Sequence, residues 1–265
     1  MTIDPILQTA ASVAPLVFVY MIAWFVAAMI ARRNDIVDIA WGLGFITIAV
    51  WLLMRADPSP SARLYIASAL VFVWGARLAW HIARRNLRPG KTEDSRYAEW
   101  RRSWGRWFVP RSFFQIFMLQ GVFMVFISAP VQVMGSAVGP GLGVLDFAGI
   151  GVWVFGFMFE AVGDAQLARF LADPANKGHI MDQGLWRFTR HPNYFGEAMM
   201  WWGLGIMALS ITGGWFGLIG PIMITWLLTK VSGIPLVERP REGKPEWEAY
   251  KARTSAFLPL PVRKS

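Results

Sequence analysis

Long apolar stretches separated by short polar connections dominate the chain. Seven of them reach the length of about 20 residues that an α-helix needs to cross the hydrocarbon core of a bilayer, and each holds few charged residues. The predicted spans are 12–31, 36–54, 63–83, 113–134, 144–165, 194–212 and 214–232. The pattern therefore predicts an all-α membrane protein, a bundle of about seven transmembrane helices.

Basic residues are distributed unevenly between the connections. The connections after spans one, three, five and seven are rich in Arg and Lys, whereas residues 135–143 and 213–214 carry no charge. Because Lys and Arg accumulate in cytoplasmic connections, we expect the amino terminus outside and the carboxyl terminus in the cytoplasm. A bacterial inner membrane fits this pattern. We expect one membrane domain over residues 1–265, with a cytoplasmic tail at 233–265.

Composition narrows the chemistry. The net charge of +9 lies in connections next to the membrane, where topology and anionic lipid head groups explain it, so nucleic acid is not an expected partner. The chain has no Cys, which removes disulfides and thiolate nucleophiles. With three His and no HExxH pattern, a metal site is not expected either.

Four basic residues follow one helical face at the end of span three. Arg77, His81, Arg84 and Arg88 are spaced by four, three and four residues. Guanidinium groups offer forked donors to phosphate oxygens, so this stripe suits a polyphosphate. Snorkelling to lipid phosphates explains Arg84 and Arg88 equally well, but explains the deeper Arg77 poorly.

Span five ends in two carboxylates on one face, Glu160 and Asp164. Like charges at this spacing repel, so both need partners, either a ligand or the basic stripe. An ion pair between Glu160 and Arg77 is the structural alternative. Gly149, Gly151 and Gly156 in the same span are expected to allow close helix packing rather than to form a nucleotide loop, since no βαβ unit surrounds them.

A dense polar segment opens span six. Pro192 is typical of a first helical turn, so a helix is predicted to begin there, with free N–H groups that attract anions. A plain interfacial helix start with its aromatic belt is the alternative. The segment reads Arg190-His191-Pro192-Asn193-Tyr194-Phe195-Gly196-Glu197 and follows Gly184-Leu185-Trp186.

These residues resemble the steroid 5α-reductase-like membrane family, and in particular its bacterial branch. The similarity is strongest from Phe155 to Pro259 and is looser over Arg77 and Arg88. Its elements are Asp164, Gly184-Leu185-Trp186, Asn193-Tyr194-Phe195-Gly196-Glu197, Tyr250-Lys251-Ala252-Arg253 and Pro259.

The resemblance implies a seven-helix bundle that holds NADPH in a cavity facing the cytoplasm. Such enzymes reduce a carbon–carbon double bond conjugated to a carbonyl. Positions that match cofactor contacts in the family are Arg77, Arg88, Asp164, Asn193, Glu197 and Tyr250. Further candidates for the cofactor are Arg169, Lys177, Arg190 and His191.

The chain departs from the steroid enzymes at the substrate. Trp74 stands where the family has a Tyr that hydrogen-bonds the substrate carbonyl, and Glu160 replaces an Asn. An apolar enone or unsaturated lipid from the bilayer is therefore at least as plausible a substrate as a steroid. Asp38, if its low-dielectric position keeps it protonated, is the first candidate for the donor to the carbonyl, and Glu160 is the second. Asp38 is equally well explained as a helix N-terminal charge.

Two other functions stay open. Membrane methyltransferases that modify isoprenylcysteine or phosphatidylethanolamine also carry an Arg-His-Pro-x-Tyr-x-Gly element, matched here from Arg190 to Gly196, and bind S-adenosylmethionine. A non-enzymatic lipid-binding protein or a transporter would use the charged cluster only to tie helices together. Asp164, Asn193 and the number of cations favour the reductase.

Overall fold

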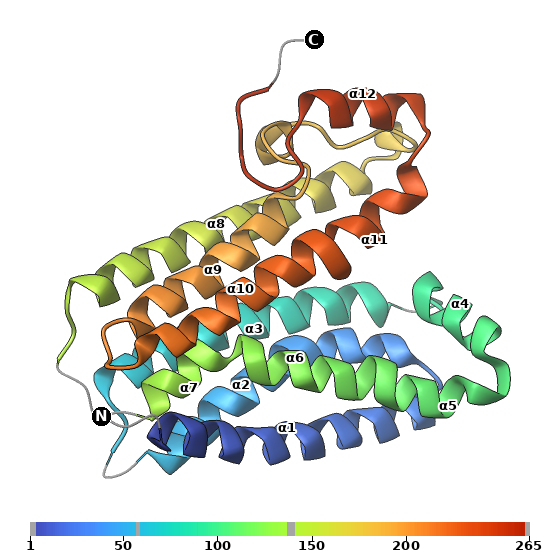
Figure 1. Ribbon diagram of the computed structural model, residues 1–265. Helices are drawn as coiled ribbons and strands as arrows, with labels where there is room; N and C mark the ends of the chain where they lie inside the picture. The colour runs from blue at the N-terminus through green and yellow to red at the C-terminus, as the bar shows by residue number, and fades with distance from the viewer. Residues whose placement is uncertain (1–3, 57–58, 89, 137–140, 263–265) are drawn as a thin grey trace. The chain divides into compact units, whose positions relative to one another are not determined.

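The computed structural model describes residues 4–56, 59–88, 90–136 and 141–262, and the regular structure of these residues is helical (Figure 1). The chain forms two compact units. Unit 1 comprises Met1–Gly143 and Ala208–Ile219, and unit 2 comprises Val144–Met207 and Gly220–Ser265. Each unit is described by itself.

Unit 1 is built from long helices joined by short turns. Its helices are α1 (Asp4–Ala31), α2 (Val37–Arg55), α3 (Ala62–Asn86), α4 (Ser95–Trp104), α5 (Phe108–Arg111), a π-helix (Ser112–Met118), α6 (Leu119–Ile127), α7 (Ala129–Gly135) and the 3-10 helix η6 (Gly214–Leu218). Another 3-10 helix, η1 (Asn34–Ile36), leads directly into α2. The chain from α4 to α6 is nearly continuous, and it turns at Gly105, where φ is +49°.

Glycine lets α2 and α3 approach closely. A Cβ on Gly42 would lie 2.6 Å from the carbonyl oxygen of Gly75, and a Cβ on Gly75 would lie equally close to the carbonyl oxygen of Gly42. No side chain fits in that space, so the two backbones pack directly against each other. Such small-residue contacts are a main source of helix association in membranes, where the hydrophobic effect does not drive helices together.

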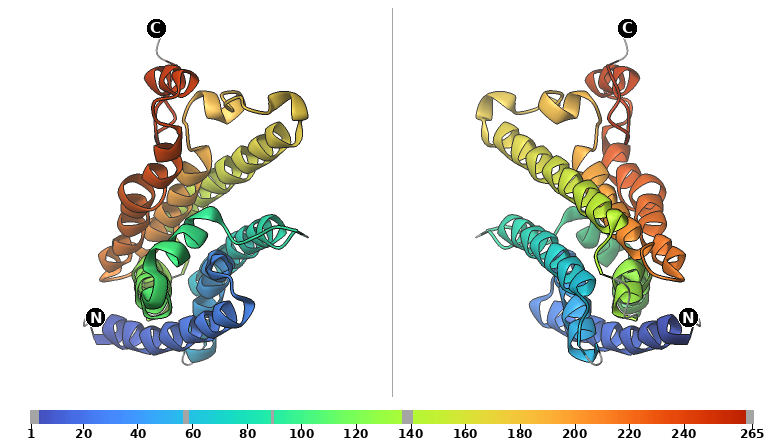
Figure 2. Two further views of the ribbon diagram at one scale, coloured as in Figure 1. Left: turned by 90° about the vertical axis from the view of Figure 1, so that its right-hand side faces the viewer. Right: turned by 90° about the vertical axis from the view of Figure 1, so that its left-hand side faces the viewer.

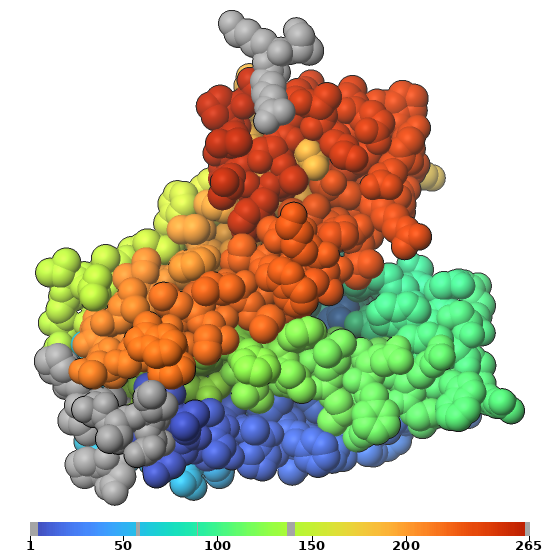
Figure 3. Space-filling view, in the orientation of Figure 1, coloured from blue at the N-terminus to red at the C-terminus, as the bar shows by residue number. Residues whose placement is uncertain are grey.

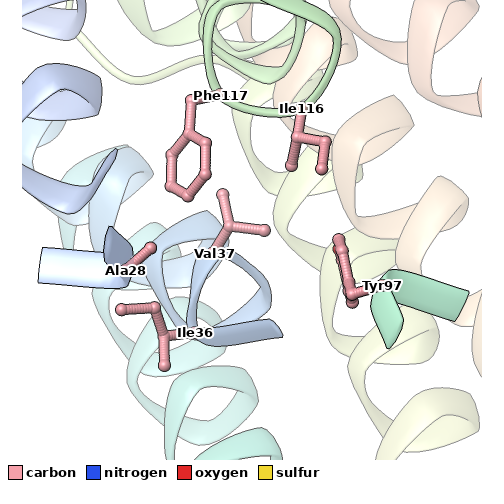
Figure 4. Close-up of a cluster of buried hydrophobic side chains, with 6 residues drawn as sticks. All are labelled: Ala28, Ile36, Val37, Tyr97, Ile116 and Phe117. Carbon is pink, nitrogen blue, oxygen red and sulfur yellow. The ribbon is translucent and has the colours of Figure 1, made fainter. Parts of the chain in front are cut away.

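A buried apolar cluster joins α1 and α2 to the chain that follows α3. Figure 4 shows its six side chains: Ala28, Ile36, Val37, Tyr97, Ile116 and Phe117. Tyr97 comes from α4, so the cluster fixes this short helix on the amino-terminal end of α2. The predicted connection 84–112 is thus partly helical and packed.

Unit 2 contains the helices α8 (Val144–Ala172), α9 (Pro192–Ala208), α10 (Ile219–Trp226), α11 (Ile234–Glu238) and α12 (Pro245–Arg253). A π-helix (Leu227–Val231) continues α10, and short 3-10 helices lie at Pro174–Asn176, Gly184–Arg187 and Arg239–Arg241. The helix predicted to open at Pro192 begins there.

Two of the three predicted packing glycines of α8 lie against α9. A Cβ on Gly149 would lie 2.5 Å from the carbonyl oxygen of Gly203, and one on Gly156 would lie 2.6 Å from that of Gly196. Gly151 has open space around it, so the packing role is confirmed only for Gly149 and Gly156.

Backbone hydrogen bonds attach the carboxyl-terminal tail to the segment before α9. The amide of Arg190 donates to the carbonyl of Ser255, and the amide of Leu260 donates to that of Phe188. Within unit 2, the segment between α8 and α9 and the helix α12 gather at one end in both views of Figure 2. This end carries the polar residues described below.

Six helical stretches of the described residues are long and apolar enough to cross a membrane: Pro5–Ala31, Asn34–Arg55, Ala62–Asn86, Ser95–Ile127, Val144–Ala172 and Gly214–Arg241. The chain is thus an integral membrane protein. The remaining predicted span, 194–212, corresponds to α9, whose 17 residues end at Ala208 before the turn at Gly213, where φ is +79°. The count of seven, the single domain and the orientation of the termini stay predictions. Residues 137–140 of the uncharged connection lie outside the described part.

Candidate functional site

A buried carboxylate organises the polar end of unit 2. Glu238, at the end of α11, accepts hydrogen bonds from the Nε and Nη2 of Arg190 at 2.9 and 3.1 Å. Its Oε1 also lies 2.8 Å from the Nε2 of His191. All three side chains are buried, so the forked guanidinium and the carboxylate compensate each other's desolvation.

The remaining donor atom of Arg190, Nη1, binds the carbonyl oxygens of Lys251 and Thr254. Its guanidinium also lies over the ring of Trp247. Every nitrogen of this guanidinium therefore has a partner within the protein. Arg190, a predicted phosphate ligand, ties α9, α11 and α12 together in this structure.

His191 is held between a ring and a carboxylate. Its imidazole stacks on Tyr194 with the ring centroids 5.2 Å apart. Burial lowers the pKa of His191, although the hydrogen bond to Glu238 opposes this effect. The side chain is therefore a neutral imidazole at neutral pH.

Two elements of the sequence motif meet at the start of α9. The side-chain amide of Asn193 donates to Asp164 Oδ1 at 3.3 Å, and Asn193 Oδ1 accepts from the amide of Tyr194. The approach is possible because Gly163 lies under Pro192, where a Cβ would lie 3.1 Å from the proline ring. Asn193 and Asp164 are half-buried, so both side chains lie partly at the surface.

The Gly-Leu-Trp element supports this arrangement. The indole of Trp186 donates to the carbonyl of Gly163, and the hydroxyl of Tyr250 donates to the carbonyl of Trp186. Gly184 has a φ of +60°, and a Cβ there would clash with the side chain of Gln166. Burial raises the pKa of Tyr250, so this hydroxyl keeps its proton and the bond.

A hollow of about 430 Å³ opens beside this scaffold, entirely within unit 2. Phe170 and Tyr250 supply aromatic surface, and Arg253, which forms an ion pair with Asp182, supplies charge. Its other lining residues are Asn176, His179, Ile180, Gln183, Glu246 and Ala249.

The other predicted residues of unit 2 differ in exposure. Arg169 and Lys177 are exposed near the end of α8 and beyond it, Glu197 is half-buried, and Glu160 is only 4% exposed. In α8, Glu160 lies one turn before Asp164, as the spacing predicts.

Unit 1 carries a second polar cluster at the amino-terminal end of α2. Asp35 is fully buried and binds the guanidinium of Arg33 through both oxygens, at 3.0 and 2.8 Å. Asp35 Oδ2 also accepts from the backbone amide of Asp94, the last residue of the connection between α3 and α4. Asp35 therefore holds this connection at the start of α2.

Asp38 lies one turn further along and faces α4. Its Oδ1 accepts from the hydroxyl of Tyr97 at 2.7 Å, and its Oδ2 lies 3.4 Å from the guanidinium of Arg96. With two donors around it, Asp38 is placed to accept from Tyr97 and Arg96. Tyr97 was missed by sequence reasoning, because 59 residues separate the partners. Its place beside Arg96 in a charged connection gave no signal.

Two of the four stripe residues, Arg77 and Arg88, were predicted to contact the cofactor, and both belong to unit 1. Arg77 is half-buried on α3, whereas Arg88 is exposed beyond its end and donates from Nε to the carbonyl of Arg84 at 3.2 Å. Arg77, Arg88 and Asp38 thus lie in unit 1, and the remaining predicted residues lie in unit 2. The structure brings Asn193, Asp164, Arg190, His191 and Tyr250 into one scaffold.

Comparison with known proteins gives relatives without an assigned activity. A protein of Schizosaccharomyces pombe, described as uncharacterised, is 24% identical over 227 residues, which make up 75% of this chain and 64% of that protein. The chain therefore spans slightly less than two thirds of this relative. No solved structure matches the chain. A family model matches residues 24–254, and the chain belongs to that family, described as a protein of unknown function (DUF1295).

Proposed function

We propose that this protein is an NADPH-dependent membrane reductase that acts on a carbon–carbon double bond conjugated to a carbonyl in an apolar lipid or steroid. The observation that carries the proposal is the hydrogen bond between Asn193 and Asp164. Both residues belong to the pattern shared with the steroid 5α-reductase-like family, and they come from different helices, 29 residues apart. A shared sequence pattern whose members meet at one half-buried place is expected of a ligand site.

The residues of unit 2 fit the chemistry of a nicotinamide dinucleotide. Asp164 accepts from ribose hydroxyls, and Asn193 both donates and accepts, as a carboxamide or ribose requires. Arg169 and Lys177 are exposed cations available to phosphate groups. The hollow lined by Phe170 and Tyr250 has room for part of such a cofactor.

The scaffold residues take a positioning role in this proposal. Arg190 has all its nitrogens engaged, His191 is bound to Glu238, and the Tyr250 hydroxyl donates to a carbonyl. They hold the start of α9 in place, so that Asn193 faces Asp164. Phosphate binding in unit 2 falls to the exposed cations Arg169 and Lys177 instead. Arg77 and Arg88, which belong to unit 1, stay predictions from the resemblance.

The bound cofactor would supply hydride, and the chain must supply stabilisation of the negative charge that develops on the carbonyl oxygen. Asp38 and Glu160 were the candidates from sequence. Asp38 already accepts from Tyr97 within unit 1, so we assign donation to the protonated carboxyl group of Glu160, which is buried on α8 one turn before Asp164.

A turnover assay tests the proposal. The purified protein in lipid nanodiscs is mixed with NADPH and a set of apolar enones, and both NADPH consumption and the reduced product are measured. The proposal requires product formation in proportion to NADPH oxidised. If NADPH binds but no enone is reduced, the protein binds the nucleotide without being a reductase, and the proposal is refuted.

The alternative is an S-adenosylmethionine-dependent membrane methyltransferase. One observation favours the methyltransferase. All the nitrogens of Arg190 bind within the protein, so one cation fewer is available to the phosphates of NADPH. The element from Arg190 to Gly196 fits both activities. Transfer of a labelled methyl group from S-adenosylmethionine to a lipid acceptor would decide for the methyltransferase.

A further inference from the structure

Residues 104–111 of unit 1 combine exposed cations with two indole rings, of which Trp107 is exposed and Trp104 half-buried. The segment contains Trp104, Arg106, Trp107 and Arg111 around the turn at Gly105. Trp107 is 56% exposed, and both arginines are exposed. The green surface of this part of the chain faces the viewer in Figure 3.

The charges of this segment are not balanced locally. Most neighbouring arginines have acidic partners: Arg96 pairs with Asp94 and Asp38, Arg101 with Glu93, and Arg102 with Glu99. Arg106 and Arg111 have no carboxylate within ion-pair distance among residues 4–56, 59–88, 90–136 and 141–262. Two exposed positive charges are therefore available to an external anion.

Both arginines lie over indole rings. The guanidinium carbon of Arg106 is 5.8 Å from the ring centroid of Trp107, and that of Arg111 is 5.9 Å from the ring centroid of Trp104. These distances are within the range of cation–π attraction. The rings thus hold the guanidinium groups near the surface, where their outer N–H groups can face a ligand.

The position of the segment along the chain indicates what that ligand is. The charged connection and α4 precede it, and the apolar run from Ser112 to Ile127 follows it, within a stretch able to cross a membrane. Residues 104–111 are therefore at the border between water and hydrocarbon, where Trp side chains concentrate. Val109 and Phe114 are 51% and 65% exposed, as expected for side chains directed to lipid.

We propose that residues 104–111 bind the head group of an anionic phospholipid. Arg106 and Arg111 donate to the phosphate oxygens, while Trp104 and Trp107 lie at the level where the head group joins the acyl chains. Guanidinium is suited to phosphate because its N–H groups form a planar fork. This lipid site is separate from the proposed reaction and holds whether or not the protein is a reductase.

Lipid retention by the full-length protein tests the site. The protein is reconstituted in nanodiscs with equal amounts of phosphatidylglycerol and phosphatidylcholine, transferred to detergent, and the bound lipids are quantified by mass spectrometry. The wild type should retain phosphatidylglycerol preferentially. The double variant R106Q/R111Q should lose this preference by roughly thirtyfold, and each single variant by roughly fivefold, since each basic residue near an anionic surface contributes roughly 1 kcal/mol.

Arg102→Gln is the matched control, because Arg102 is an exposed arginine of the same connection that is already paired with Glu99. It should keep the preference. An equal loss in this control, or an unchanged preference in R106Q/R111Q, would overturn the proposal. Displacement of phosphatidylglycerol by inorganic phosphate would assign the site to a free anion instead. If the double variant unfolds, the single variants Arg106→Gln and Arg111→Gln carry the same comparison.

Discussion

Arg190 and Glu238 form a forked, buried ion pair across 48 residues of sequence, with N–O distances of 2.9 and 3.1 Å. The pair connects the residue that precedes the α9 motif to the end of α11. Because this pair uses two of the guanidinium nitrogens, Arg190 is a structural residue.

Glu238→Gln should destabilise the protein strongly. Loss of the carboxylate leaves the guanidinium of Arg190 buried without a counter-charge, which typically costs about 3–5 kcal/mol. Arg190→Lys should also destabilise, because an ammonium group cannot form the fork. Thermal unfolding in detergent measures both effects. Full stability with selectively weakened NADPH binding in Arg190→Lys would instead return this residue to the cofactor.

His191 should make stability depend on pH. Burial lowers its pKa below the usual value of 6.5, so the unfolded chain takes up this proton at a higher pH than the folded protein does. The stabilising contribution is complete above about pH 6.5 and is lost as the pH falls below it. His191→Gln removes the titrating group, and its stability should fall less between pH 7 and about pH 5. Parallel stability curves for wild type and variant would contradict the account.

The α2–α3 contact should not tolerate a side chain. Gly42→Val places two methyl groups where even a Cβ would lie 2.6 Å from the carbonyl of Gly75, so the helices must separate. A loss of about 1–3 kcal/mol is expected from such overpacking. Gly151→Ala is the control: open space surrounds this glycine, and its melting temperature should be unchanged or slightly raised.

Glu160→Gln should slow substrate reduction by about a hundredfold while leaving NADPH affinity nearly unchanged, because an amide is a poorer proton source than a carboxyl group. Asp38→Asn should have a smaller effect, since Asp38 is already engaged by the hydroxyl of Tyr97. Glu99→Gln, at an exposed position of α4, is the control. Unchanged turnover in Glu160→Gln would exclude this carboxyl group.

Short-range patterns predicted the helices and local motifs well. Pro192 marks the start of α9, and Gly149 and Gly156 pack against it, because proline and glycine act through backbone geometry that the local sequence determines. The apolar stretches predicted the membrane helices because length and hydropathy are also properties of the local sequence. The end of α9 was placed several residues late, since hydropathy continues through a turn that Gly213 forms.

Partners distant in sequence could not be predicted. The pattern around Arg190 indicates a cation near a helix start, but not that Glu238 uses its donors. Similarly, Asp38 was identified as an acid near a helix start, whereas Tyr97 reaches it only because the cluster around Phe117 holds α4 in place. A long-range contact depends on packing that no local spacing encodes.

The central claim is that NADPH binds beside Asn193. A ligand that binds only the folded protein stabilises it by about 2.7 kcal/mol at a hundredfold excess over its dissociation constant, which a melting assay detects. NADPH should therefore raise the melting temperature of the wild type in detergent, and S-adenosylmethionine should not. Asn193→Ala should abolish most of the shift and lower the unliganded melting temperature only moderately, since it removes two hydrogen bonds of a half-buried side chain, each worth about 1 kcal/mol.

Thr225→Ala is the matched control, because its half-buried hydroxyl also makes two hydrogen bonds: it accepts from the indole of Trp202 at 3.2 Å and donates to the carbonyl of Pro221 at 2.7 Å. This variant should keep the full response to NADPH. The decisive measurement is thus the melting temperature of wild type, Asn193→Ala and Thr225→Ala with each ligand. A rise with NADPH that depends on Asn193 alone is the predicted result, and a rise with S-adenosylmethionine but not with NADPH would contradict the reductase.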